Sequence, residues 1–182
     1  MIQGFCKWLL YKRWGWKKEI TVDHPDKFII CLAPHTSNWD FILGQLYMRA
    51  EGLQINFLMK KEWFRGPLGT FFRRIGGIPV WRDKKTSLTE NLANTAKQEK
   101  RFHLCITPEG TRSLNPDWKK GFYYIALNAQ IPILLYALDY EKKLIQCTKQ
   151  IIPTGDIEKE MAEIKNYFKD CKGKYPELFT TG

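Results

Sequence analysis

The sequence lacks any run of apolar residues long enough to cross a bilayer. Its longest uninterrupted apolar stretches, residues 28–33 and 133–138, are far shorter than the ~20 residues that a membrane-spanning helix needs. The N-terminus offers only residues 8–11 between two lysines, which is too short for the hydrophobic region of a signal peptide, and no cleavage site follows. We therefore expect a protein of the cytoplasm or of the cytoplasmic side of a membrane.

The sequence also lacks the patterns of several reactive sites. Its five cysteines are an odd number, are widely spaced and form no CxxC pair, so neither a disulfide framework nor a zinc site is expected. It has no cluster of metal-ligand residues and no GxSxG motif, and we expect no metal and no resident cofactor. The 182 residues, 44% of them apolar and 26% charged, are enough for one folded domain.

Positive charge and aromatic residues are what the sequence has in excess, and the two coincide. The net charge is +10. Residues 1–18 carry five lysines and arginines and no acid, residues 60–85 carry eight against two acids, and each segment holds five aromatic residues. Such segments bind anionic lipid headgroups, bind nucleic-acid phosphates and bases, or form a solvated basic face over an aromatic core. Composition alone does not choose among these interpretations.

Hydrophobic periodicity predicts helices and strands that alternate along the chain. The expected helices cover residues 2–14, 38–51, 61–75 with a break at Gly66-Pro67, 86–99, 119–129 and 156–170. The expected strands cover residues 27–33, 54–60, 78–81, 102–107 and 131–138, with a further pair within 143–152. This alternation is typical of an α/β fold with a mostly parallel central sheet flanked by helices. Such a sheet places ligands at the carboxyl ends of its strands.

The loop after the strand at 27–33 combines a histidine with a helix start. Ser37 is a favourable N-cap residue, and Asp40 three positions later completes the pattern of a capping box. His35 then lies in the turn before the helix, where the Asp40 carboxylate can reach one ring nitrogen and leave the other free as a general base. The alternative is that Asp40 only caps the helix and that His35 is an ordinary loop residue.

Two other segments carry residues suited to an anion. In TPEGTRS, after the strand at 102–107, Glu109 and Arg112 flank Gly110-Thr111, which gives a tight polar turn with exposed N–H groups and a guanidinium. In GGIPVWR, a short strand ends at Arg82. The alternatives are a Glu109–Arg112 ion pair in an ordinary loop and one more surface cation at Arg82.

These segments together resemble one enzyme family. The blocks HTSNWD, GGIPVWR and TPEGTRS, followed by Ile131-Pro132-Ile133, occur in the order and approximate spacing of the four motif blocks of the glycerolipid acyltransferases. Residues 28–138 resemble this family, which is typified by the 1-acyl-sn-glycerol-3-phosphate acyltransferases. The resemblance implies the fold of these enzymes. It also implies transfer of a fatty acyl group from acyl-CoA or acyl carrier protein to a lysophospholipid such as 1-acylglycerol-3-phosphate.

The resemblance further implies a role for each motif residue. His35 would be the general base that takes the proton of the acceptor hydroxyl or amine, and Asp40 would orient it. The acceptor site, with its arginines facing a phosphate or another anion, would be formed by Arg82, Glu109, Gly110, Thr111 and Arg112. Two alternatives stay open. One is the same chemistry on an amino-acid or glycan lipid, and the other is a non-catalytic basic module that binds anionic lipid or nucleic acid.

With a lipid acceptor, we expect both basic, aromatic segments to bind an anionic membrane surface and expect no nucleic-acid partner. Four apolar residues have the spacing of one helical stripe: Phe64, Leu68, Phe71 and Ile75. We interpret this stripe as part of the membrane-binding surface, and the alternative is that it belongs to the core. We divide the chain into an N-terminal amphipathic, interfacial segment, residues 1–18, and one acyltransferase domain, residues 19–182. The residues predicted to contact the membrane are Trp8, Trp14, Trp16, Trp63, Phe64, Leu68, Phe71, Arg73 and Arg74.

Overall fold

The computed structural model describes residues 2–80 and 85–182, and for residues 85–87 it describes the backbone. The strands are β1 (Lys17–Ile20), β2 (Lys27–Ala33), β3 (Asn56–Lys60), β4 (Gly77–Val80), β5 (Phe102–Ile106), β6 (Ile133–Asp139), β7 (Leu144–Cys147) and β8 (Gln150–Ile151). The α-helices are α1 (Ile2–Lys7), α2 (Asn38–Glu51), α3 (Gly66–Arg74), α4 (Lys85–Gln98), α5 (Gly121–Ala129) and α6 (Ile157–Phe168). Shorter turns of helix are η1 (Trp8–Arg13), a π-helix, and the 3₁₀ helices η2 (Lys61–Phe64) and η4 (Pro176–Leu178).

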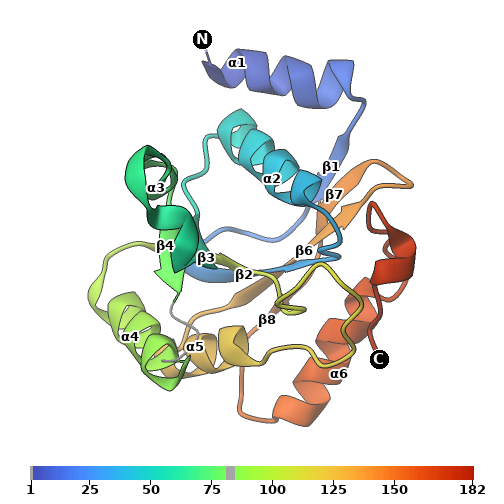
Figure 1. Ribbon diagram of the computed structural model, residues 1–182. Helices are drawn as coiled ribbons and strands as arrows, with labels where there is room; N and C mark the ends of the chain where they lie inside the picture. Colours follow the sequence, from blue (N-terminus) through green and yellow to red (C-terminus); the bar gives the residue numbers. More distant parts are fainter. Residues whose placement is uncertain (1, 81–84) are drawn as a thin grey trace.

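The described strands form one sheet with helices on both faces (Figure 1). The strand order is β1-β7-β6-β2-β5-β3-β4, and β8 pairs with β6. β6, β2, β5, β3 and β4 run parallel to one another, whereas β7 and β8 pair with β6 in the antiparallel direction. This arrangement confirms the predicted α/β fold with a mostly parallel central sheet.

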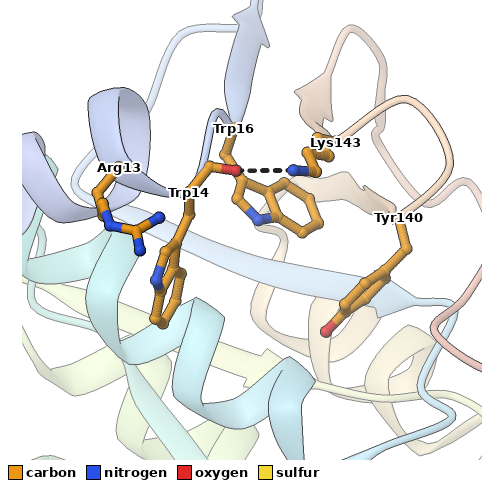
Figure 2. Close-up of a pocket in the computed structure, with 5 residues that line it drawn as sticks. All are labelled: Arg13, Trp14, Trp16, Tyr140 and Lys143. Carbon is orange, nitrogen blue, oxygen red and sulfur yellow. Dashed lines mark hydrogen bonds between the residues drawn. The ribbon is translucent and has the colours of Figure 1, made fainter.

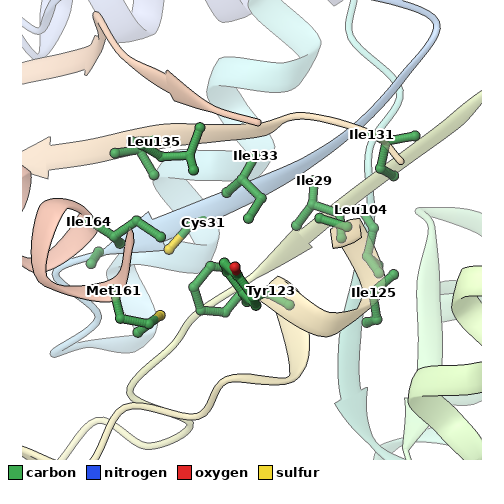
Figure 3. Packing of buried hydrophobic residues seen from close by; sticks show 14 of the residues in the cluster. Ile29, Cys31, Leu104, Tyr123, Ile125, Ile131, Ile133, Leu135, Met161 and Ile164 are labelled. Carbon is green, nitrogen blue, oxygen red and sulfur yellow. The ribbon is translucent and has the colours of Figure 1, made fainter. Parts of the chain in front are cut away.

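The central strand β2 is buried on both faces, which explains why its sequence is a continuous apolar run. Neighbouring residues of a strand point to opposite faces. Phe28 therefore packs with Leu10 on the face covered by α1, η1 and α2. Ile29 packs on the other face, where Figure 3 shows Tyr123 of α5 and Ile164 of α6. The sheet thus has an apolar core on each side and leaves its carboxyl edge for polar loops.

The predicted helices and strands are present, with shifts of one or two residues at several ends. β1 was not predicted, because it carries no apolar alternation: Lys17, Lys18 and Glu19 are exposed, and only Ile20 is half-buried. This edge strand is defined by its parallel pairing with β7. The predicted helix at 2–14 divides into α1 and the π-helix η1.

The N-terminal segment is part of the folded domain, which corrects the division at residue 18. β1 crosses that boundary, and Cys6, Leu10 and Trp16 belong to the core that also contains α2. The Trp16 side chain is 7% exposed, and its ring packs edge-on against Tyr140 with 5.1 Å between the ring centroids. The prediction that Trp16 contacts a membrane is therefore wrong, because a ring buried between protein groups cannot reach a bilayer.

The remaining predicted membrane contacts differ in exposure. The half-buried ones are Trp14 and Phe64, and the exposed ones are Trp8, Trp63, Leu68, Phe71, Arg73 and Arg74. The predicted stripe is not on one helix, because Phe64 lies in η2 and α3 begins at Gly66. Its two outer members, Phe64 and Ile75, are partly buried, whereas Leu68 and Phe71 face solvent. In residues 2–80 and 85–182, no helix is both long enough and apolar enough to cross a bilayer.

Candidate active site

Two polar loops meet at the edge of the sheet where the parallel strands end. β2 and β5 are neighbours, with Cys31 opposite Ile106, so the loop after β2 and the loop after β5 begin side by side. The first loop holds His35, and the second holds Glu109. The backbone N–H of His35 donates to Oε1 of Glu109 at 2.8 Å, and this hydrogen bond joins the two loops.

The start of α2 places an aspartate against the histidine. Ser37 caps the helix by accepting the N–H of Trp39 at 3.2 Å, and the predicted capping box with Asp40 is present. Oδ2 of Asp40 accepts the N–H groups of Thr36 and Ser37, each at 2.9 Å, and lies 3.1 Å from Nδ1 of His35. The contact between His35 and Asp40 that the sequence predicts is therefore present.

This geometry determines the state of the imidazole ring. Asp40 is 1% exposed, and the hydrogen bonds that it accepts replace the water that it loses on burial. Because a carboxylate can only accept, Nδ1 is the donor in this contact, and Nε2 is the ring nitrogen that faces away from Asp40. The His35 side chain is 20% exposed, so the ring is accessible to a substrate. A histidine held by a buried carboxylate at one ring nitrogen has a geometry that suits proton transfer at the other.

A tyrosine that the sequence analysis did not identify completes the bonding of the carboxylate. The hydroxyl of Tyr140 donates to Oδ1 of Asp40 at 2.7 Å. Burial raises the pKa of Tyr140, and the charge of Asp40 raises it further, so the hydroxyl keeps its proton and stays a donor. Tyr140 directly follows β6, at the same edge of the sheet as the two loops. Only this general rule of position, and no motif, could have drawn attention to it.

Glu109 is buried in the second loop, where few groups stabilise a negative charge on its carboxylate. It is 3% exposed, and burial raises its pKa to about 7, although the N–H group and the charge of His35 act in the opposite direction. Its Oε2 atom has no hydrogen-bond partner among the residues that the structure describes. The side chain of Asn115 donates to the Glu109 carbonyl oxygen at 2.7 Å and holds the loop from the other side. Glu109 therefore connects the loop after β5 to the loop of His35.

The turn after Glu109 presents a guanidinium to the start of α2. Gly110 has φ of +66°, a conformation that favours glycine. Thr111 and Arg112 are exposed, and Nη1 of Arg112 donates to Oδ1 of Asn38. Arg112 thus pairs with Asn38, and the alternative of an ion pair with Glu109 is not what the structure shows. Arg82, which the sequence analysis places in the same site, lies outside the described residues.

A segment near the C-terminus also packs against the histidine loop, and no sequence signal predicted this. The N–H of Tyr175 donates to Oγ1 of Thr36 at 3.1 Å. A Cβ atom added to Gly173 would lie 2.8 Å from the same oxygen, so the backbone of this segment touches the loop directly. Nζ of Lys174 lies 4.5 Å from the centroid of the Trp39 ring. This contact adds a second cation at the start of α2.

An apolar pocket of about 80 Å³ lies between α2 and the sheet and borders Asp40. The side chains that line it come from both layers and include Leu32, Phe41, Met48, Ile55 and Leu138. One region of the fold therefore combines the His35–Asp40 pair, surface cations and an apolar pocket.

Known proteins resemble this chain in sequence and in fold. Human 1-acyl-sn-glycerol-3-phosphate acyltransferase beta is 28% identical over 105 residues, which are 55% of this chain and 38% of that protein. The chain thus spans well under half the length of this curated relative. The crystal structure of the 1-acyl-sn-glycerophosphate (LPA) acyltransferase, PlsC, from Thermotoga maritima has the same fold. Its TM-score is 0.57 at 17% identity, and the match covers 91% of this chain and 74% of that one.

The family model described as Acyltransferase matches residues 18–138, well over half of the chain. The chain therefore belongs to the acyltransferase family.

Proposed function

We propose that this protein transfers a fatty acyl group from an acyl thioester to the hydroxyl group of a lysophospholipid. The donor is acyl-CoA or acyl carrier protein, and the acceptor is a compound such as 1-acylglycerol-3-phosphate. The observation that carries the proposal is the 3.1 Å contact between Nδ1 of His35 and the buried carboxylate of Asp40. The names of the relatives support the substrate class, and the site supports the presence of a base for the transfer.

In the proposed reaction, Nε2 of His35 takes the proton of the acceptor hydroxyl while its oxygen attacks the thioester carbonyl carbon. A C–O bond forms, the C–S bond breaks, and the leaving thiolate receives the proton from His35. The products are an ester and a free thiol. A thioester is already activated, so one well-placed base suffices. Proton transfer by such a base accelerates a reaction by about 10²–10⁴-fold, and alignment of two bound substrates contributes further.

Asp40 has an electrostatic task in this reaction. When His35 takes the proton it becomes a cation, and the carboxylate 3.1 Å from Nδ1 stabilises that cation. Three further donors fix the carboxylate in place: the N–H groups of Thr36 and Ser37 and the hydroxyl of Tyr140. The charge is therefore aligned before the reaction begins, which avoids reorganisation during the proton transfer.

The acceptor binds beside the start of α2, where Arg112 binds its phosphate. The resemblance of the sequence motifs assigns Arg82 to the same task. The turn residues Gly110 and Thr111 offer backbone N–H groups, and Glu109 supports the loop. The hydrogen bond from Arg112 to Asn38, two residues before Asp40, supports this location. The apolar pocket that borders Asp40 holds only the part of the acyl chain next to the reacting carbonyl, because its volume is about 80 Å³.

The reaction takes place at an anionic membrane surface, on its cytoplasmic side. Leu68 and Phe71 of α3 are 58% and 53% exposed, and Arg73 and Arg74 follow them on the same helix. Exposed apolar side chains beside cations suit the boundary between headgroups and acyl chains. Each cation near an anionic surface contributes about 1 kcal/mol to binding.

A panel of substrates tests this function. Purified protein is incubated with acyl-CoA or with acylated acyl carrier protein, each against lysophospholipids and against amino-acid and glycan lipids, and products are identified by mass. We expect an acylated phospholipid from the parent protein. We expect a loss of about 10²–10⁴-fold from His35→Ala. The control is His24→Ala, which removes a histidine from the loop before β2.

The same experiment separates the alternatives. Acylation of an amino-acid or glycan lipid alone would assign a different acceptor to the same chemistry. A His35→Ala protein as active as its parent would contradict the role of the base. If no acceptor is acylated and the protein binds DNA as well as anionic vesicles, a non-catalytic basic module is the better explanation.

A further inference from the structure

A second pocket, of about 320 Å³, lies between the end of η1 and the turn that joins β6 to β7. Figure 2 shows the residues that line it: Arg13, Trp14, Trp16, Tyr140 and Lys143. None of them belongs to the four motif blocks of the sequence. The volume is at the lower end of the range typical of small-molecule sites.

The pocket is lined by positive charge without a counterion. None of the five lining residues is acidic. Arg13 is exposed, and its side chain has no ion pair or hydrogen bond with any residue that the structure describes. Lys143 donates one N–H from Nζ to the carbonyl oxygen of Trp14 at 3.0 Å, which holds the amine at the pocket wall (Figure 2). Its two other N–H groups remain for a ligand.

A buried indole adds a directed donor. Trp16 is 7% exposed and lines the pocket, and Figure 2 shows its ring between those of Trp14 and Tyr140. In the described part of the chain this N–H has no protein acceptor. It is also not one of the fully buried atoms that lack a partner, so it keeps contact with solvent at the pocket and can donate to a ligand there.

We propose that this pocket binds the phosphate group of a ligand through Arg13, Lys143 and the indole N–H of Trp16. A phosphate offers several acceptor oxygens and a negative charge, which match a guanidinium, an amine and a neutral N–H around one space. The rings of Trp14 and Tyr140 cover the group attached to the phosphate. Binding here requires no chemical step, and the inference rests on the proposed function only where the ligand is coenzyme A, the carrier of its donor.

Two sources of this chemistry are relevant, the headgroup of a membrane glycerophospholipid and coenzyme A. Both present a phosphate ester to the pocket, so the experiment has to distinguish them. Tyr140 lines the pocket and donates its hydroxyl to Asp40. A phosphate bound here therefore lies one tyrosine side chain away from the His35–Asp40 pair.

Direct binding to the full chain tests the proposal. The indole N–H resonance of Trp16, assigned with the Trp16→Phe variant, is followed by NMR of ¹⁵N-labelled protein. The protein is titrated with sn-glycerol 3-phosphate and with coenzyme A. The matched compounds without phosphate are glycerol for the first and a mixture of pantetheine and adenosine for the second. We expect the resonance to move with a phosphate compound and to stay in place with its matched control. The compound that moves it at the lower concentration identifies the source.

Two double variants test whether Arg13 and Lys143 bind the phosphate. Arg13→Gln/Lys143→Gln is expected to weaken binding at least tenfold. Lys12→Gln/Lys169→Gln removes the same charge from exposed positions outside the pocket and is expected to change the affinity less than twofold. The proposal is overturned by an unmoved resonance with both phosphate compounds, by equal movement with the matched controls, or by equal weakening in both double variants. Because the readout is binding and not turnover, its failure is distinct from failure of the acyl-transfer proposal.

Discussion

Glu109 makes the stability of this protein depend on pH in a direction opposite to that of most acidic residues. It is 3% exposed, and burial raises its pKa from the ordinary 4.5 to about 7. Between these two values the folded chain keeps a proton that the unfolded chain has released. The free energy of unfolding therefore falls as the pH rises from about 4.5, and the loss is complete above about 7. A difference of this size corresponds to about 3 kcal/mol, since one pKa unit is about 1.4 kcal/mol.

The substitution Glu109→Gln isolates this effect. Glutamine keeps a carbonyl oxygen that can accept the N–H of His35, but it does not titrate. Urea unfolding of both proteins is measured between pH 4.5 and 8.5, and other titrating groups largely cancel in the difference between them. We expect the free energy of unfolding of Glu109→Gln, minus that of the parent protein, to increase by about 3 kcal/mol over this range. The exposed Glu99→Gln serves as control and should show no such trend. A difference that stays constant with pH for Glu109→Gln refutes the reasoning.

Two further predictions concern the site and the surface. Tyr140→Phe keeps the ring but leaves Oδ1 of Asp40 without its donor. A hydrogen bond to a charged group contributes about 1.5–3 kcal/mol, so kcat is expected to fall about 10- to 100-fold with KM for the acceptor unchanged. Steady-state kinetics beside the exposed Tyr124→Phe checks this, and a kcat within twofold of the parent would contradict it. Leu68→Glu is expected to reduce sedimentation with anionic vesicles at least threefold, whereas Ile152→Glu, also at an exposed position, should not; equal effects would argue against α3 as a contact surface.

The parts of the site that the sequence predicts depend on local rules. The contact between His35 and Asp40 follows from a capping box, which spans only a few residues and needs no knowledge of the rest of the fold. The nearness of the His35 and Glu109 loops follows from the rule that parallel strands expose their carboxyl ends at one edge of a sheet. Even so, the rule does not give strand order. That β2 and β5 are direct neighbours is information that only the structure provides.

The parts that the sequence does not predict depend on contacts between distant segments. Tyr140 reaches Asp40 across 100 positions, and Tyr175 reaches Thr36 across 139. Neither contact produces a periodic pattern in the sequence, because each depends on a single residue in a loop. Trp16 shows that a local pattern can also mislead. Its neighbours in the sequence are basic and aromatic, as in a membrane-binding segment, yet its side chain is buried. That burial depends on packing beside β1, a strand without apolar alternation.

The burial of Trp16 changes how the N-terminal segment contributes to the proposed function. This segment carries the exposed Trp8, while the ring of Trp16 packs edge-on against Tyr140, whose hydroxyl holds Asp40. Backbone pairing between β1 and β7 fixes the segment to the sheet. If a membrane-binding segment were joined to the domain by a flexible linker, the distance between His35 and the lipid surface would not be fixed. Here the segment and His35 belong to one packed unit, so in the proposed function contact of the segment with lipid headgroups would also set the position of His35. For an acceptor whose hydroxyl lies at headgroup level, this connection would supply part of the alignment that the proposed transfer requires.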